Sequence, residues 1–241
     1  MFGISIPSLY DLIYAYKEYD QEVKQIECNL RSIGFTFDSV LELACGTGCY
    51  LEHFGCEQKF GVDICEESLM YASFRVGRAS FKKFDITKIS SKNTPFSSKR
   101  FDLIVGLFGA IGYVSKDQLY TSISNWLELL NPDGILLLEP WHEYPKVGEY
   151  HQTYRSKGID IHRRTEVQFL QELQNQTIMD FTYTVVQNDQ THILQTQECL
   201  YSHSFDELKS IIEEQCGGII VHTDKSSFTN DGQWYIKRKK Q

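Results

Sequence analysis

The stretch that decides the fold is Val40-Leu41-Glu42-Leu43-Ala44-Cys45-Gly46-Thr47-Gly48-Cys49-Tyr50-Leu51. A short apolar run stops at two glycines and then resumes, which predicts a strand, a tight turn and a helix. Gly46 and Gly48 permit a backbone path that disfavours residues with a Cβ, and they let a polar ligand approach the main chain beside the partly positive helix N-terminus. The dinucleotide fingerprint has a third glycine where this chain has Leu51, so the pattern disfavours a bound pyrophosphate.

Glu42 lies inside this motif, at the carboxyl end of the predicted strand. A carboxylate at that place repels a phosphate and attracts an ammonium group. Together with Leu51, it argues against an NAD-dependent oxidoreductase.

The composition narrows the class of protein. The chain has 241 residues and a formal net charge of −8, which favours one domain with an insertion and argues against nucleic-acid or anionic-membrane partners. The basic run Lys237 to Lys240 is interpreted as a solvated tail. Seven cysteines without a Cys-x-x-Cys pair predict reduced thiols, and no bound metal is expected. No apolar run is long enough to span a membrane, so we expect a soluble, cytoplasmic protein.

Two further predicted strands also end in acids. Residues 59–64 end near Asp63, and residues 79–86 end near Asp85, at intervals of 21 and 22 residues from Glu42 and Asp63. An acid at the tip of the second strand is placed to accept from two ribose hydroxyls. Ile64 and Met70 are candidate apolar neighbours of an adenine ring.

The remaining pattern predicts the sheet. Residues 100–113 form a near-continuous apolar strand, residues 118–130 a helix that ends at 131–134, and residues 135–141 a fifth parallel strand. We therefore expect an α/β fold with a doubly wound, mostly parallel seven-stranded sheet. The last two strands, near 219–223 and 233–239, are predicted to form a hairpin after a helix that opens with the capping box Ser204 to Glu207.

Two segments fall outside this core. Residues 1–34 are predicted to form a helical lid with Ser8 as an N-cap and a break near Lys17-Glu18, and residues 143–202 an antiparallel insertion of two or three strands. Residues 35–142 and 203–241 form the ligand-binding domain. The alternating apolar residues of the insertion, such as Ile159 and Ile161, predict that it covers the acceptor or pairs with a second copy in a homodimer.

The chain resembles class I S-adenosylmethionine (SAM)-dependent methyltransferases through Glu-Leu-Ala-Cys-Gly-Thr-Gly (42–48), Asp63, Asp85 and the Phe101 strand. Short stretches outside that region resemble the N,N-dimethyltransferases of nucleotide-linked deoxyamino sugars. These stretches are Tyr-Asp-Leu-Ile-Tyr (10–14), Leu-Glu-His-Phe (51–54), Gly-Tyr-Val (112–114), Leu-Glu-Pro-Trp (138–141) and Tyr-Ser-His (201–203). In that family the tryptophan is commonly doubled, whereas His142 follows Trp141 here.

The resemblance implies SAM as the cofactor and a small-molecule acceptor. It assigns cofactor contacts to Tyr14, Glu42, Ala44, Cys45, Gly46, Gly48, Asp63, Ile64, Met70, Asp85, Ile86 and Leu107. It assigns acceptor contacts to Tyr19, Phe108, Trp141 and Tyr201. An acceptor amine must lose its proton, and the candidates for taking it are Tyr14, Glu139, His142 and His203.

Each of these four candidates also has a structural interpretation, and a methyltransferase can work by proximity alone. The predicted function is methyl transfer to the amino group of a small molecule, with a nucleotide-linked amino sugar as the most specific acceptor. The alternatives are O-methylation of a small molecule and a SAM- or nucleotide-binding module without catalysis.

Overall fold

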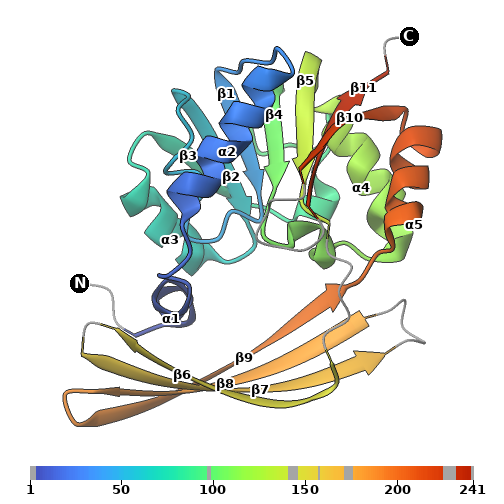
Figure 1. The fold of residues 1–241 in the computed structure, drawn as a ribbon. Helices are drawn as coiled ribbons and strands as arrows, with labels where there is room; N and C mark the ends of the chain where they lie inside the picture. Colours follow the sequence, from blue (N-terminus) through green and yellow to red (C-terminus); the bar gives the residue numbers. More distant parts are fainter. Residues whose placement is uncertain are drawn as a thin grey trace. The chain divides into compact units, whose positions relative to one another are not determined.

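The chain folds into two compact units. The computed structural model describes residues 4–96, 99–140, 146–156, 158–170, 176–224 and 232–239. One unit, here called the parallel-sheet unit, takes residues 18–142 and 203–241, and the other, the antiparallel-sheet unit, takes residues 1–17 and 143–202 (Figure 1). The predicted lid, residues 1–34, is therefore divided between the two units.

The parallel-sheet unit contains the predicted seven-stranded sheet. Its strands are β1 (Ser39–Leu43), β2 (Gln58–Asp63), β3 (Ala79–Lys83), β4 (Phe101–Gly106), β5 (Leu130–Leu138), β10 (Gly218–Asp224) and β11 (Gln233–Arg238). They are ordered β10-β11-β5-β4-β1-β2-β3. β1 to β5 run parallel, and β11 pairs antiparallel with both β5 and β10. The strand order reverses between β1 and β4, which is where open α/β sheets bind ligands.

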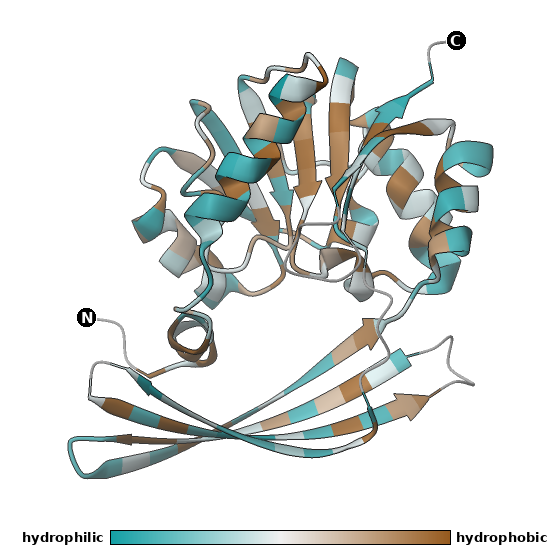
Figure 2. Ribbon diagram, viewed as in Figure 1, coloured by the Kyte–Doolittle hydropathy of each residue, from teal (hydrophilic) through white to brown (hydrophobic). Residues whose placement is uncertain are grey.

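Helices cover both faces of this sheet. On one face, α2 (Tyr19–Ser32) packs Val23, Ile26 and Leu30 onto the sheet. On the other, α4 (Lys116–Glu128) packs there together with α5 (Phe205–Ser210) and the π-helical turn Ile211–Gln215. α3 (Glu66–Arg75) connects β2 to β3. Figure 2 shows apolar residues concentrated along the central strands, as predicted for a sheet covered on both faces.

The structure corrects the segment after Gly48. The predicted helix is absent, and residues 49–53 form consecutive turns held by bonds such as Glu52 N–H to Gly48 O, 3.0 Å. A single helical turn has the same apolar spacing as a helix start, but the chain must return to β2 at Gln58. β5 also begins at Leu130, earlier than predicted, because Leu130 pairs with Phe101.

Two predicted N-caps have different outcomes. α1 spans Ile6–Ile13 and is capped by Ser5, with Ser8 completing a capping box from the third helical position, so the prediction of Ser8 as the cap was wrong. The predicted interruption before Tyr19 is confirmed, because α2 is a separate helix. Ser204 caps α5 as predicted, accepting from the Glu207 amide at 3.2 Å.

The antiparallel-sheet unit has one strand more than the sequence predicted. β6 (Gly148–Ser156), β7 (Ile159–Leu170), β8 (Gln176–Gln187) and β9 (Gln190–Tyr201) form a four-stranded meander. β6 is an edge strand whose residues are largely polar and exposed, so it lacks the apolar alternation that indicates a strand.

α1 covers part of one face of this meander. Leu9 and Ile13 of α1 form a buried cluster with Ile161, Tyr183 and Val185. Ile161 is therefore buried by a helix from the N-terminal part of the same chain. A second copy of the chain is not needed to cover it. Within the described ranges, no helix has both the length and the apolar character required to cross a bilayer.

Candidate functional site

The turn after β1, residues 44–48, here called the cradle turn, is built from alternating left-handed residues. Ala44, Gly46 and Gly48 have φ angles of 52°, 52° and 77°, and the Gly48 amide donates to the Cys45 carbonyl at 2.9 Å. A Cβ added to Gly46 would meet no atom of the described residues within 4 Å, whereas one at Gly48 would lie 3.2 Å from the Ala72 Cβ. Gly48 is thus required for packing against α3, and Gly46 opens onto space that a ligand can use.

Asp63, at the end of β2, holds this turn in place. One carboxylate oxygen accepts from the Gly46 amide and the other from the Cys65 amide, each at 2.8 Å. Burial raises the pKa of Asp63, and the backbone hydrogen bonds partly offset that rise. The Ile64 amide also donates to this carboxylate, and two carboxylate oxygens together offer about four lone-pair sites, so acceptor capacity is left for the predicted ribose hydroxyls.

Glu42, at the end of β1, is almost completely buried. It is 4% exposed, its Oε2 has no hydrogen-bond partner among the residues that the structure describes, and the Leu51 amide donates to its carboxyl group. Burial, and then the nearby charge of Asp63, raise the pKa of Glu42 well above its ordinary value. The same two effects, with Glu42 itself, raise the pKa of the buried Cys45 thiol.

The other predicted cofactor residues have different degrees of exposure. Asp85 caps a short 3₁₀ helix, Ile86–Lys88, and accepts from the Thr87 amide at 2.9 Å. Burial alone would raise the pKa of Asp85, but hydrogen bonds from Thr87 and Lys88 lower it below the ordinary value. Ile64 and Met70 are exposed, as an adenine wall requires before a ligand binds, whereas Ile86 and Leu107 are buried.

The carboxyl ends of β4 and β5 meet at Glu139. This side chain is 1% exposed and accepts a hydrogen bond from the Phe108 amide, and the Glu139 amide donates to Gly106 O at 2.9 Å. Phe108 itself is left-handed, with φ of 52°. Such backbone strain in residues with a Cβ costs about 1–3 kcal/mol and clusters at functional sites.

A tyrosine–glutamate pair lies beside this region and was not predicted. The Tyr50 hydroxyl donates to Glu22 Oε2 at 2.7 Å, and its ring packs edge-on against Tyr19 with centroids 4.9 Å apart. Burial, followed by the charges of Glu139 and Glu22, raises the pKa of Tyr50. The structure therefore brings the predicted residues Tyr19 and Glu139 into one neighbourhood. Tyr50 directly follows the glycine turn, but nothing in the sequence indicates Glu22.

His203 is a buried histidine held by backbone groups. It is 1% exposed, and its Nε2 lies 2.9 Å from the Val114 carbonyl oxygen. Burial lowers the pKa of His203, and the contacts with Val114 and Ile111 counteract this. The contacts favour its structural interpretation, and its role as a proton acceptor stays a prediction.

The remaining predicted acceptor residues cannot be placed beside the cradle turn. Trp141 and His142 lie outside the described residues. Tyr14 and Tyr201 belong to the antiparallel-sheet unit, where Tyr14 ends α1 and interacts with Arg163, and Tyr201 accepts from Gln176 at 3.3 Å. Their roles stay predictions.

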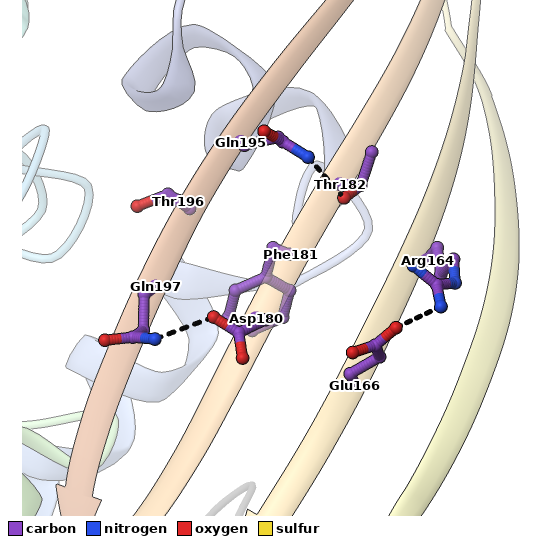
Figure 3. Close-up of a pocket in the computed structure, with 8 residues that line it drawn as sticks. All are labelled: Arg164, Glu166, Asp180, Phe181, Thr182, Gln195, Thr196 and Gln197. Carbon is purple, nitrogen blue, oxygen red and sulfur yellow. Dashed lines mark hydrogen bonds and ion pairs between the residues drawn. The ribbon is translucent and has the colours of Figure 1, made fainter.

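A shallow polar hollow lies on the antiparallel sheet, and its lining residues bond to one another. Gln197 donates to Asp180 at 2.7 Å, Gln195 donates to Thr182 at 3.3 Å, and Arg164 is paired with Glu166 (Figure 3). Such exposed pairs are typical of a solvated face. Among the residues described, no three His, Cys, Asp or Glu side chains gather as metal ligands would.

Comparison with known proteins gives one matching family model and several relatives. Residues 40–134, which contain the cradle turn, Asp63, Asp85 and β4, match the methyltransferase domain family. The dTDP-3-amino-3,4,6-trideoxy-alpha-D-glucopyranose N,N-dimethyltransferase of Streptomyces venezuelae is 30% identical over 146 residues, which cover 58% of this chain and 59% of that protein. The dTDP-3-amino-3,6-dideoxy-alpha-D-glucopyranose N,N-dimethyltransferase of Streptomyces fradiae is 27% identical over 56% of this chain and 53% of its own.

The fold agrees over a longer part of the chain than the sequence does. The crystal structure of Streptomyces venezuelae DesVI superimposes with a TM-score of 0.84 and 21% identity, covering 99% of this chain and 100% of that chain. The sequence matches, by contrast, span less than two thirds of either dimethyltransferase. The predicted fold class and the resemblance to class I methyltransferases are confirmed.

Proposed function

We propose that this chain is a SAM-dependent N-methyltransferase, and that its acceptor is the amino group of a nucleotide-linked sugar. The proposal rests on the residues around the cradle turn. The space at Gly46 is open, and the adjoining Glu42 Oε2 is buried without a partner. An orphaned buried carboxyl oxygen fits a ligand with a cationic group, so these residues fit SAM better than a phosphate-bearing dinucleotide.

When bound, SAM supplies an activated methyl group on a sulfonium, with its own leaving group. The residues of this chain then have to bind SAM and the acceptor, orient them for transfer, and exclude water. In this proposal Asp63 holds the ribose hydroxyls, Asp85 accepts from the adenine amine, and Glu42 holds the ammonium of the amino-acid part. The left-handed turn at Phe108, fixed by Glu139, shapes the end of β4 next to them.

The acceptor amine has to be unprotonated when it reacts. Glu139, Tyr14, His142 and His203 remain the candidates for taking its proton, directly or through water. Replacement of the correct residue is expected to lower turnover by roughly 10²–10⁴-fold with SAM affinity nearly intact, and the loss should shrink at high pH, where the amine is already neutral.

The amino-sugar acceptor is supported by the printed activities of the two dimethyltransferase relatives. Mass spectrometry after incubation with SAM and a panel of amino-sugar nucleotides tests it. We expect products that have gained one or two methyl groups. Matched nucleotide sugars with a hydroxyl in place of the amine serve as controls and should stay unmodified. Methylation of the hydroxyl compounds instead would indicate O-methylation.

The proposal includes a homodimer formed through the antiparallel sheet. Its face opposite α1 is polar and carries exposed ion pairs such as Arg155–Asp160, which suits a hydrated interface better than an apolar one. Light scattering tests the assembly. A strict monomer, together with unchanged activity after deletion of residues 157–190, would remove both roles predicted for the insertion.

A further inference from the structure

Glu42 is a buried carboxyl group that has few hydrogen-bond donors. It belongs to β1, where it is paired with Gly61 of β2 and Val105 of β4, neither of which brings a charge. Among the described residues, its Oε2 has no hydrogen-bond partner, and the donor to its carboxyl group is the Leu51 amide.

Among the described residues, the charged group that acts on Glu42 is Asp63, and it disfavours the ionised form of Glu42. Asp63 approaches from β2, and the Cys45 thiol lies in the turn that follows β1. α2 covers this face of the sheet, and its Glu22 is bonded to Tyr50. Within the described ranges, no basic side chain is recorded as acting on Glu42.

A buried carboxylate without a cation or sufficient donors is so unfavourable that such a group normally takes up a proton. The raised pKa of Glu42, caused by burial and by Asp63, agrees with this geometry. In the ligand-free protein these surroundings favour the protonated, neutral form of the Glu42 carboxyl group.

We propose that binding of the ligand ammonium at Glu42 releases one proton from the Glu42 carboxyl group to solvent. The inference rests on the proposed function, because it takes SAM as the ligand. The neutral carboxyl group and the ligand ammonium become a carboxylate–ammonium pair, and the displaced proton leaves. The O–H bond of Glu42 breaks, the new contact is a charge-assisted hydrogen bond at Oε2, and no redox partner is required.

Two consequences distinguish this arrangement from a carboxylate that is ionised in advance. Affinity for SAM should increase with pH, by up to about tenfold per pH unit while Glu42 is protonated in the free protein. A ligand with the adenosine and the thioether but without the amino acid has no cation to exchange for the proton, so 5′-methylthioadenosine should bind without releasing one.

Calorimetry with the full chain measures the released proton directly. S-adenosylhomocysteine keeps the ammonium group and is not consumed, so it replaces SAM. Titrations are made in phosphate and in imidazole buffer at a pH near 6.5. Because the two buffers differ in their heat of ionisation, the difference between the two binding enthalpies gives the number of protons released. At this pH the ligand enters as an ammonium, since free α-amino groups titrate near ~7.7–8.0. We expect close to one proton released per S-adenosylhomocysteine, and close to none with 5′-methylthioadenosine.

Two variants assign the proton to its source. Glu42→Gln should abolish the release, because it keeps the shape and removes the ionisable group, and Asp63 remains as in the parent. Glu67→Gln, at an exposed position in the first turn of α3, is the matched control and should release as much as the parent. If Glu42→Gln fails to fold, the pH dependence of S-adenosylhomocysteine affinity in the parent protein tests the inference without it.

The outcomes separate this inference from the function on which it rests. If the parent binds neither S-adenosylhomocysteine nor SAM, the proposed function fails and the inference fails with it. Binding without proton release and with affinity independent of pH would overturn the inference alone. Release that persists in a folded Glu42→Gln protein would likewise overturn it, because another group would be the source.

Discussion

Replacement of Asp63 by alanine tests whether one side chain both builds the cradle turn and binds the ligand. The carboxylate accepts from two backbone amides at 2.8 Å, Gly46 and Cys65. Hydrogen bonds to a charged group contribute roughly 1.5–3 kcal/mol each, and burial of that charge offsets part of the gain. We expect Asp63→Ala to lower the free energy of unfolding by about 2–4 kcal/mol. Asp63→Asn keeps one carbonyl acceptor and should lose about half as much.

The same replacement should weaken SAM binding by about 10–100-fold, the loss expected when a bond to a ribose hydroxyl disappears. Urea unfolding of the ligand-free protein gives the first quantity and calorimetry of the folded variant the second. Asp38→Ala, at an exposed position before β1, is the control and should change neither. An unchanged unfolding midpoint would refute the role in the turn. Unchanged SAM affinity in the folded variant would refute the ribose assignment.

Three further replacements test the packing and charge of the cradle. Gly61→Ala places a Cβ 2.7 Å from the Cys45 sulfur and should destabilise the protein by about 1–3 kcal/mol in urea, whereas Gly77→Ala, which meets no atom within 4 Å, should not. Gly46→Ala should lower the free energy of unfolding by only about 1–2 kcal/mol, since Ala44 tolerates the same φ. Its effect on SAM affinity should be much larger, because the added Cβ enters the space that the ligand would occupy. Because the folded-state pKa of Glu42 is raised, the stability of the parent relative to Glu42→Gln should fall as pH rises from the ordinary glutamate range, by up to about 1.4 kcal/mol per pH unit. A flat difference would contradict the buried, unpaired state of Glu42.

The predicted part of the site follows from sheet topology. Glu42, Asp63 and Asp85 each come at or just after the end of a short strand, and parallel strands end at one edge of their sheet. The apolar runs indicated those strands without any knowledge of side-chain contacts. The order of the strands then placed the acids near one another.

The parts that the sequence did not predict depend on contacts between distant residues. Tyr50 and Glu22 are 28 positions apart, and no local pattern links them. α1 packs on Ile161 although about 150 residues separate them, and the local pattern of residues 1–34 predicts only a separate helical lid. The predicted helix after Gly48 was wrong because one turn and a helix start share the same apolar spacing.

The proposed N-methyltransferase activity is tested by transfer of a carbon-13-labelled methyl group from SAM to an amino-sugar nucleotide. Nuclear magnetic resonance of the product distinguishes a methyl group on nitrogen from one on oxygen, and chromatography of the same sample measures S-adenosylhomocysteine. The account predicts an N-methyl signal that grows in step with S-adenosylhomocysteine and requires the amine-bearing acceptor. Label on oxygen, or no S-adenosylhomocysteine with any amino sugar although SAM binds, would contradict it.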